Sequence, residues 1–210
     1  MEEIKTVNKT KTKNSVYVKK LVMIALFGAL ATVVMMWKFP IPLAPSFYKF
    51  EFSEVITLLG AYILGPVSGV VIELIKCLLN LLIDGTTTAY VGEISNFVIG
   101  CSLIVPASIL MRKMKGIKGL VLGGVVGIIS VTVVAALLNY FVLIPAYVSV
   151  AGYPMDAIIG MAASIYPSID DLFGLIILCT VPFNLLKGGV SVLAGVLIAK
   201  ALPKKLTQGI

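Results

Sequence analysis

The segment Gly119–Tyr147, GLVLGGVVGIISVTVVAALLNYFVLIPAY, contains no charged residue. A helix needs about 20 mainly apolar residues to cross the hydrocarbon core of a bilayer, which is about 30 Å thick, and this segment is longer. The rest of the chain has the same character, since 59% of its 210 residues are apolar and 13% are charged, against about 45–50% and about 25% in soluble domains. The sequence therefore predicts an all-α integral membrane protein.

Further apolar runs lie on both sides of this segment and predict six transmembrane helices in all. The run Ser53–Leu64 would be only about 18 Å long as a helix, so we expect it to begin in the preceding Glu51-Phe52 stretch, to tilt strongly or to stop short against protein. The last run should kink at Pro182. The other five runs are Leu21–Trp37, Ser53–Leu64, Pro66–Ile83, Val91–Met111 and Leu172–Leu202.

Basic residues gather in three places and predict how the chain is oriented. Six lysines precede the first apolar run, four basic residues lie between 112 and 118, and three lysines follow or end the last run. Cytoplasmic loops carry an excess of Lys and Arg, so we expect both termini and the 112–118 loop in the cytoplasm. This rule explains the net charge of +7 without nucleic acid.

Four crossings before the 112–118 loop and two after it satisfy the orientation, and a re-entrant hairpin over 53–83 would satisfy it equally. Both termini inside then leave three polar loops outside, at 38–50, 84–90 and 149–168. The domain organisation that follows is a flexible polar leader (1–18), one six-helix domain (19–205) and a cytoplasmic tail (206–210).

Several residue types are missing or isolated, which excludes whole classes of enzyme. The chain has no histidine, so it cannot build a Ser-His-Asp triad or a histidine zinc site. Cys77, Cys101 and Cys179 lie singly in apolar runs and fit buried small hydrophobes better than a disulfide or a metal site. No GxxxxGK[ST] phosphate-binding loop occurs, so any energy must come from a gradient or another subunit. We expect no catalysis, no metal and no cofactor.

Polar side chains inside apolar runs are costly to insert and therefore indicate a site. Asn184 and Lys187 lie three residues apart in PFNLLKGG, and neither has an obvious partner in its helix. An unpaired lysine near the centre of a membrane helix costs about 2.5–3.5 kcal/mol on insertion scales. Lys187 should therefore face a polar cavity or a ligand, and Asn139 on the fifth helix should meet it from across the bundle.

Two further polar pairs have plainer interpretations. Glu73 and Lys76 share a face of the third helix, where a mutual ion pair would offset the cost of inserting each of them. Glu93 and Asn96 open the fourth helix, where helix capping and loop anchoring compete with ligand binding as their role. We keep Glu93 and Asn96 among the candidate ligand-binding residues.

The donors and acceptors of this set indicate the chemistry of the ligand. An amide both donates and accepts hydrogen bonds, while an ammonium only donates, and together they suit a neutral, ring-shaped ligand with imide or carbonyl edges. Few cations face the proposed site, which disfavours a multiply anionic ligand. Flat apolar faces for stacking would come from Phe47, Tyr48, Tyr140, Phe141 and Phe183.

Small residues four apart on the first helix form two stripes, Ala25 with Ala29 and Gly28 with Thr32. Such stripes let helices approach closely in lipid, where apolar burial provides little driving force. Packing within the bundle would explain either stripe. The alternative is a face on which another membrane subunit docks.

The chain contains several motifs whose order and spacing resemble those of a known family. The first outer loop carries FPIP at 39–42, PSFYK at 45–49 and EFSE at 51–54, and further along the chain are ELIK at 73–76, VGE at 91–93 with Asn96-Phe97, NYF at 139–141 and PFN at 182–184 with Lys187. From about residue 20 to 200 the chain resembles the riboflavin-binding S-components of energy-coupling factor (ECF) transporters. The family often has aspartates where this chain has Glu51 and Glu54.

The resemblance implies a six-helix protein of a prokaryotic plasma membrane that captures riboflavin from outside the cell. Asn139, Asn184 and Lys187 would hydrogen-bond the isoalloxazine ring deep among helices four to six. The loop that carries Phe47, Tyr48 and Lys49 would contact the ligand and act as a lid. Riboflavin would then be a transported ligand and not a cofactor.

The resemblance also implies partners and leaves alternatives open. In the family, small residues on the first helix meet a membrane coupling subunit that two ATPases drive, and Ala25 and Ala29 match that alanine pair. The alternatives are an S-component for FMN or another vitamin, and a self-sufficient secondary carrier in which Glu73 and Lys76 couple an ion. A membrane enzyme is disfavoured, because no nucleophile–base arrangement occurs.

Overall fold

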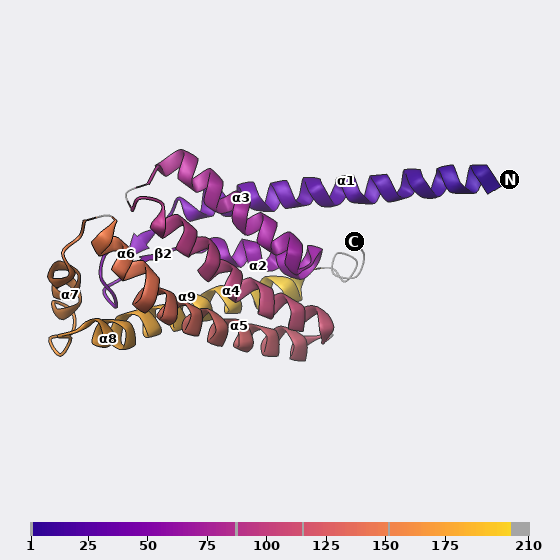
Figure 1. The fold of residues 1–210 in the computed structure, drawn as a ribbon. Coiled ribbons are helices and arrows are strands. Elements are labelled where there is room, and N and C mark those ends of the chain that lie inside the picture. Colours follow the sequence, from indigo (N-terminus) through magenta and orange to yellow (C-terminus); the bar gives the residue numbers. More distant parts are fainter. Residues whose placement is uncertain (1, 87, 115, 151, 203–210) are drawn as a thin grey trace.

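The computed structural model of the chain describes residues 2–86, 88–114, 116–150 and 152–202, with side chains from Ser15 onward. Two short strands, β1 (Phe39–Pro40) and β2 (Lys49–Phe50), pair antiparallel in the first loop. The helices, shown in Figure 1, are α1 (Glu2–Met35), α2 (Ser53–Leu64), α3 (Pro66–Asp84), α4 (Val91–Lys113), α5 (Ile117–Leu138), α6 (Ile144–Ser149), α7 (Met155–Ala163), α8 (Leu172–Leu175) and α9 (Val181–Ala201).

Five of the described segments are long and apolar enough to cross a membrane, and α2 is a shorter sixth helix. Single π-helical turns at Asn139–Leu143 and Ile176–Thr180 join α5 to α6 and α8 to α9 without a break. The second π turn ends two residues before Pro182, and the kink predicted at Pro182 itself stays a prediction. The five long segments are Ser15–Met35, Pro66–Asp84, Val91–Lys113, Ile117–Ser149 and Leu172–Ala201.

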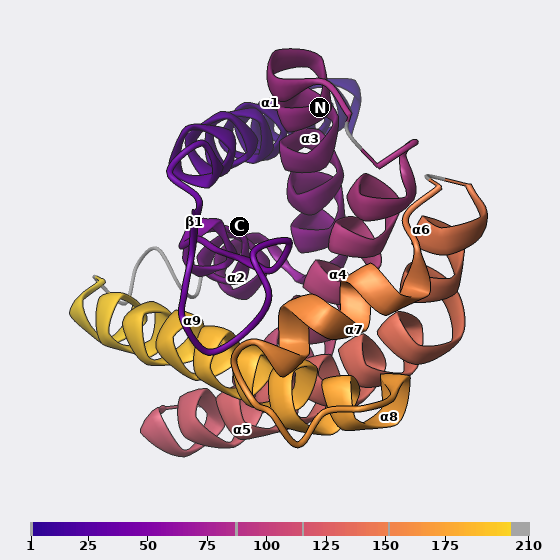
Figure 2. The same cartoon turned by 90° about the vertical axis from the view of Figure 1, so that its left-hand side faces the viewer.

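The short helix α2 stops against protein, which is one of the three possibilities that its length allowed. It begins at Ser53, ten of its twelve residues are buried, and it packs on α1, α3, α4 and α9, inside the ring of helices seen in Figure 2. Gly65, with φ 102°, ends α2, and Pro66 begins α3. Gly69 then lies so close to Ala61 that a side chain there would collide with it.

Large apolar side chains are exposed along the outward faces of the spans, for example Leu26, Leu82, Val133 and Leu197. A soluble monomer rarely exposes contiguous apolar surface on this scale. A bundle that crosses a membrane instead presents it to lipid, which agrees with the composition.

The loops that the sequence places on one face lie together in the structure. The strands, the α3–α4 connection and the segment α6–α8 are at one end of the bundle, which we call the loop end, while the amino-terminal half of α1, the α4–α5 turn and the end of α9 are at the other (Figure 1). The shared position of these loops agrees with the number of membrane crossings that was predicted from the basic residues. The assignment of the loop end to the outside of the cell stays a prediction.

The expectation that 149–168 is a loop is wrong. The predicted loop at 149–168 contains α7, whose Ile158 and Ala162 lie one turn apart and are buried in an apolar cluster with α8 and the first loop. The helix α1 begins at Glu2 and runs through the predicted leader into the first span, and the flexibility of the leader stays a prediction. The tail at 206–210 lies outside the described residues.

Candidate ligand-binding site

A cavity of about 440 Å³ lies at the loop end of the bundle. The first loop, the end of α3, the start of α4, the π turn Asn139–Leu143 and the start of α9 enclose it. The structure thus brings residues from separate segments of the chain into one place, while their contact with a ligand stays a prediction. All eight residues that the sequence indicates as ligand contacts line this cavity: Phe47, Tyr48, Lys49, Glu93, Asn96, Asn139, Asn184 and Lys187.

Tyr48 joins the two π turns across the cavity. Its hydroxyl donates to Asn139 Oδ1 at 2.8 Å and lies 2.7 Å from Thr180 Oγ1; since a phenol has one proton, Thr180 is the donor in the second contact. Burial raises the pKa of Tyr48 although the hydrogen bond with Thr180 opposes the shift, so the phenol stays protonated at neutral pH. π turns are frequent at functional sites, and here they anchor the first loop.

Backbone carbonyls orient the side-chain amides of Asn139 and Asn184. Each amide donates Nδ2 to a carbonyl one turn earlier, Asn139 to Ala135 at 2.7 Å and Asn184 to Thr180 at 2.8 Å. Because the nitrogen must face that carbonyl, the amide oxygen points the other way. Asn139 Oδ1 accepts from Tyr48, while Asn184 Oδ1 has no hydrogen-bond partner within the described part of the chain and is available to a donor on a ligand.

Lys187 has protein partners, and they lie outside its own helix. Its Nζ lies 2.7 Å from Glu51 Oε1 and 4.0 Å from Glu54 Oε1. Both carboxylates come from the junction of the first loop with α2, far away in the sequence, which is why the helix of Lys187 alone gives no sign of them. Its side chain is still 15% exposed and lines the cavity, so the ammonium can also donate to a ligand.

The same carboxylates extend to a second lysine. Lys76 Nζ lies 3.0 Å from Glu54 Oε1 and 2.6 Å from Glu73 Oε1, which confirms the predicted Glu73–Lys76 pair and adds Glu54 to it. Three carboxylates and two ammonium groups thus form one buried ion network from the cavity wall to the middle of α3. Its members are Glu51, Glu54, Glu73, Lys76 and Lys187.

Glu51 is the member of this network that belongs to the first loop. Burial would raise the pKa of its carboxyl group, but the charges of Lys187 and Lys76 outweigh burial and lower the pKa to about 2. Glu51 is therefore ionised at neutral pH and neutralises the ammonium of Lys187.

Three of the five aromatic residues that were predicted to line the site do line the cavity. Phe47, Tyr48 and Phe183 line the cavity, with ring centroids of Tyr48 4.6 Å from Phe47 and 5.2 Å from Phe183. Tyr140 and Phe141 do not line it and are 36% and 67% exposed. Successive helical residues point about 100° apart, so with Asn139 facing inward these two rings face outward.

Tyr147 also lines the cavity and was not among the residues predicted from the sequence. Its ring centroid is 6.4 Å from that of Phe47 in an edge-on contact. Tyr147 follows Asn139 by eight residues, which in a regular α-helix would turn it about 80° away from the face of Asn139. The π turn Asn139–Leu143 lies between them, and its extra residue brings Tyr147 back towards that face. The helical period of the sequence alone therefore gives no signal for Tyr147.

Glu93 and Asn96 line the cavity and also contact other parts of the bundle. Glu93 Oε2 accepts from Thr88 Oγ1 at 3.1 Å, which anchors the α3–α4 loop, and Asn96 Nδ2 lies 4.0 Å from Met35 Sδ of α1. The Gly92 N–H at the start of α4 is bound by Thr88 Oγ1 at 3.1 Å. Thr88 therefore supplies the hydrogen bond to the helix start, and Glu93 supplies the loop anchor.

The two small-residue stripes of α1 have different surroundings. Gly28 is buried against Ile75 of α3, and Thr32 Oγ1 donates to the Gly28 carbonyl at 2.8 Å, so this stripe packs inside the bundle. Ala25 and Ala29 are exposed on the outer side of α1. Packing within the chain thus explains one stripe and leaves the alanine pair accessible.

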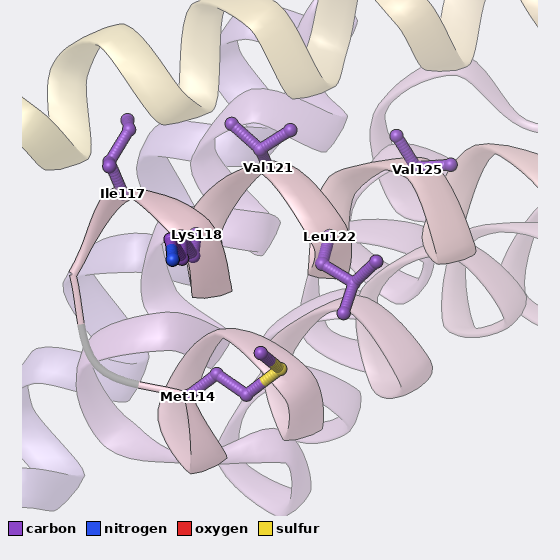
Figure 3. Close-up of a pocket in the computed structure, with 6 residues that line it drawn as sticks. All are labelled: Met114, Ile117, Lys118, Val121, Leu122 and Val125. Atoms are coloured by element: carbon purple, nitrogen blue, oxygen red, sulfur yellow. The ribbon is translucent and has the colours of Figure 1, made fainter.

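A shallow surface depression of about 450 Å³, whose six lining residues are all exposed, lies near the opposite end of the bundle. Figure 3 shows its lining on the first turns of α5 and the end of α4. Lys118 is the one charged residue among the six that line it, and the other five are apolar, so it offers no set of amide and carboxylate groups comparable to the loop end. Its lining residues are Met114, Ile117, Lys118, Val121, Leu122 and Val125.

Both the sequence and the fold of this chain are similar to those of known transporter components. Residues 19–199 match the family model described as "ECF transporter, substrate-specific component". The fold is similar to a solved structure described as "Structure and mechanism of the S component of a bacterial ECF transporter", with a TM-score of 0.71, 31% identity, and coverage of 90% of this chain and 98% of that chain.

Curated relatives cover most of the chain. The "Riboflavin transporter RibU" of Staphylococcus aureus (strain TCH60) is 32% identical over 190 residues, which are 90% of this chain and 93% of that protein. The "Riboflavin transporter FmnP" of Bacillus subtilis (strain 168) is 31% identical over 172 residues, which are 81% of this chain and 85% of that protein.

Proposed function

Because the chain belongs to the family of substrate-specific components of ECF transporters, we propose that it captures riboflavin in the cavity at the loop end. We further propose that it delivers the vitamin across a bacterial plasma membrane together with a coupling subunit and two ATPases. The five apolar spans and the bacterial transporter relatives support a multi-pass membrane protein. The relatives are transporters, in agreement with a binding subunit without catalysis.

The observation that carries this proposal is the set of oriented polar groups in one aromatic-walled cavity. Its volume of about 440 Å³ lies within the about 300–1,000 Å³ that small-molecule sites occupy. Riboflavin has a flat tricyclic ring with an imide edge and a hydroxylated side chain. Asn184 Oδ1 would accept from the imide N–H, Lys187 would donate to a ring carbonyl, and Phe47 and Phe183 would pack against ring faces.

The charges around the cavity favour the unphosphorylated vitamin over FMN. A phosphate ester adds a charge of about −1.5 to −2 at pH 7. Of the three lysines in the wall, Lys187 and Lys38 are neutralised by Glu51 and Asp84, so the wall offers a phosphate Lys49 alone and sets the carboxylate of Glu93 against it. We expect the purified protein to quench riboflavin fluorescence on titration and to bind FMN at least about tenfold more weakly. Equal affinity for both flavins would contradict this charge argument, and the absence of quenching by either would contradict the proposed ligand.

The exposed alanine pair of α1 supports docking of a coupling subunit. We expect Ala25→Leu or Ala29→Leu to leave the riboflavin affinity unchanged and to reduce uptake severalfold in cells that contain the coupling subunit and ATPases, because a bulky side chain holds helices apart. Leu26→Phe, on an exposed residue of the same helix, is the matched control for added bulk. Uptake by the alanine variants at the level of the control would contradict docking at this stripe.

The same uptake assay separates the proposed function from a self-sufficient carrier. The chain alone in vesicles should bind riboflavin without accumulating it, and accumulation should require the coupling subunit and ATP. Accumulation by the chain alone, driven by an ion gradient, would favour the carrier.

A further inference from the structure

Glu51 occupies a position that the proposed ligand contacts do not use. It lies at the end of the first loop, is 3% exposed, and is in the wall of the cavity. Oε2 accepts from the Ser53 N–H at 2.5 Å, at the first residue of α2, and Oε1 lies 2.7 Å from Lys187 Nζ. One carboxylate thus connects the start of α2 with the cavity-facing ammonium of α9.

Glu54, the other acidic partner of Lys187, is held mainly by Lys76. Glu54 Oε1 lies 4.0 Å from Lys187 Nζ but 3.0 Å from Lys76 Nζ, to which it is hydrogen-bonded. Lys76 is fully buried and draws Glu54 toward α3. Glu51 is therefore the carboxylate that fixes where the Lys187 ammonium lies.

The location of Glu51 at the start of α2 makes it a rigid anchor. A carboxylate at a helix N-terminus is stabilised by the free N–H groups and by the helix dipole. A long lysine side chain, by contrast, has many rotamers and loses conformational entropy when it is fixed. A lysine held by a rigid carboxylate before the ligand arrives loses less on binding, because its rotamer is already selected.

From these contacts we propose that Glu51 is a positioning residue for ligand binding: it holds the Lys187 ammonium at the cavity wall and acts on the ligand through Lys187. The proposal rests on the proposed function for the identity of the ligand, riboflavin. The ion pair between Glu51 and Lys187 is independent of which ligand binds. Because Glu51 belongs to the end of the first loop, the position of Lys187 also depends on where that loop ends against the bundle.

The test is a double-mutant cycle on Glu51→Gln and Lys187→Met, with riboflavin fluorescence quenching as the readout. We expect Glu51→Gln alone to raise the riboflavin Kd about tenfold, within the range of coupling between contacting groups. In the Lys187→Met background the same change should leave Kd within about twofold of the Lys187→Met single variant. If Glu51 contacted riboflavin directly, the two losses would multiply instead, and the proposal would be overturned.

Asp84→Asn serves as the matched control carboxylate. Asp84 pairs with Lys38 near the same cavity but does not contact Lys187. Its effect on Kd, whatever its size, should multiply with that of Lys187→Met. If the Asp84–Lys187 cycle showed coupling as large as the Glu51–Lys187 cycle, the coupling would not be specific to Glu51, and the proposal would be overturned.

A second cycle, on thermal unfolding of the ligand-free protein in detergent, tests the ion pair independently of riboflavin. Each single variant should lower the unfolding midpoint, and the double variant should lower it by less than the sum, because it leaves no unpaired charge between them. Additive losses in the ligand-free protein would overturn the proposal even if riboflavin binds. Coupling there together with no riboflavin quenching by the wild-type protein would instead contradict the proposed function.

Discussion

Replacing Lys76 by methionine should lower the free energy of unfolding by about 3–5 kcal/mol, because it leaves buried carboxylates without their cation. Lys76 is 0% exposed and lies 3.0 Å from Glu54 Oε1 and 2.6 Å from Glu73 Oε1. Glu73 Oε2 is itself buried and has no hydrogen-bond partner among the described residues. The other cation of the network, Lys187, lies 4.0 Å from Glu54 Oε1 and is paired with Glu51, so it is a poor substitute for Lys76. Denaturant unfolding in detergent, followed by circular dichroism, measures the loss.

Two variants control for this result. Lys118→Met removes an exposed lysine of α5 and should change stability by no more than about 0.5 kcal/mol. Adding Glu73→Gln to Lys76→Met should recover part of the loss, because it removes one of the two stranded charges while keeping the shape of the side chain. A loss below about 1 kcal/mol in Lys76→Met would mean that the carboxylates are compensated by another group.

Only part of this ion network could be predicted from the sequence. The apolar runs predict the helices because lipid requires long uninterrupted apolar segments, and Glu73 and Lys76 predict their own ion pair because they share a helix face. The partners of Lys187 could not be predicted in this way. Glu51 and Glu54 reach it only after α2 has folded into the ring of helices, and no local pattern encodes that contact.

The candidate site shows the same division between local and long-range information. Asn139, Asn184 and Lys187 are readable from the sequence because polar groups in apolar helices are few and costly. The bridge from Tyr48 to both π turns depends on the exact path of the first loop, and an extra residue in a helical turn leaves no clear sequence signature. The helix α7 was missed because its apolar face, Ile158 and Ala162, is only one turn long and lies among glycine and proline.

Asn184→Ala should weaken riboflavin binding about 5- to 150-fold, which corresponds to the about 1–3 kcal/mol lost when a buried polar group is left without its partner. Asn184 is 6% exposed, and its Nδ2 is held on the Thr180 carbonyl at 2.8 Å, so its Oδ1 is fixed in the cavity wall before any ligand arrives. The imide N–H of the ring would lose this acceptor, and the small alanine side chain cannot replace it. Titration by riboflavin fluorescence quenching measures the change.

The neighbouring residue provides a control on the same turn of α9. Leu185 is 46% exposed on the outer face, so Leu185→Ala should leave Kd unchanged. Asn184→Asp keeps the size of the side chain but replaces the amide nitrogen by an acceptor that faces the Thr180 carbonyl, so it should disturb the orientation of the group and weaken binding at least as much as alanine. Wild-type affinity in both Asn184 variants would remove Asn184 from the site, whereas weakened binding with an unchanged unfolding midpoint in Asn184→Ala would assign the loss to the ligand contact and not to the fold.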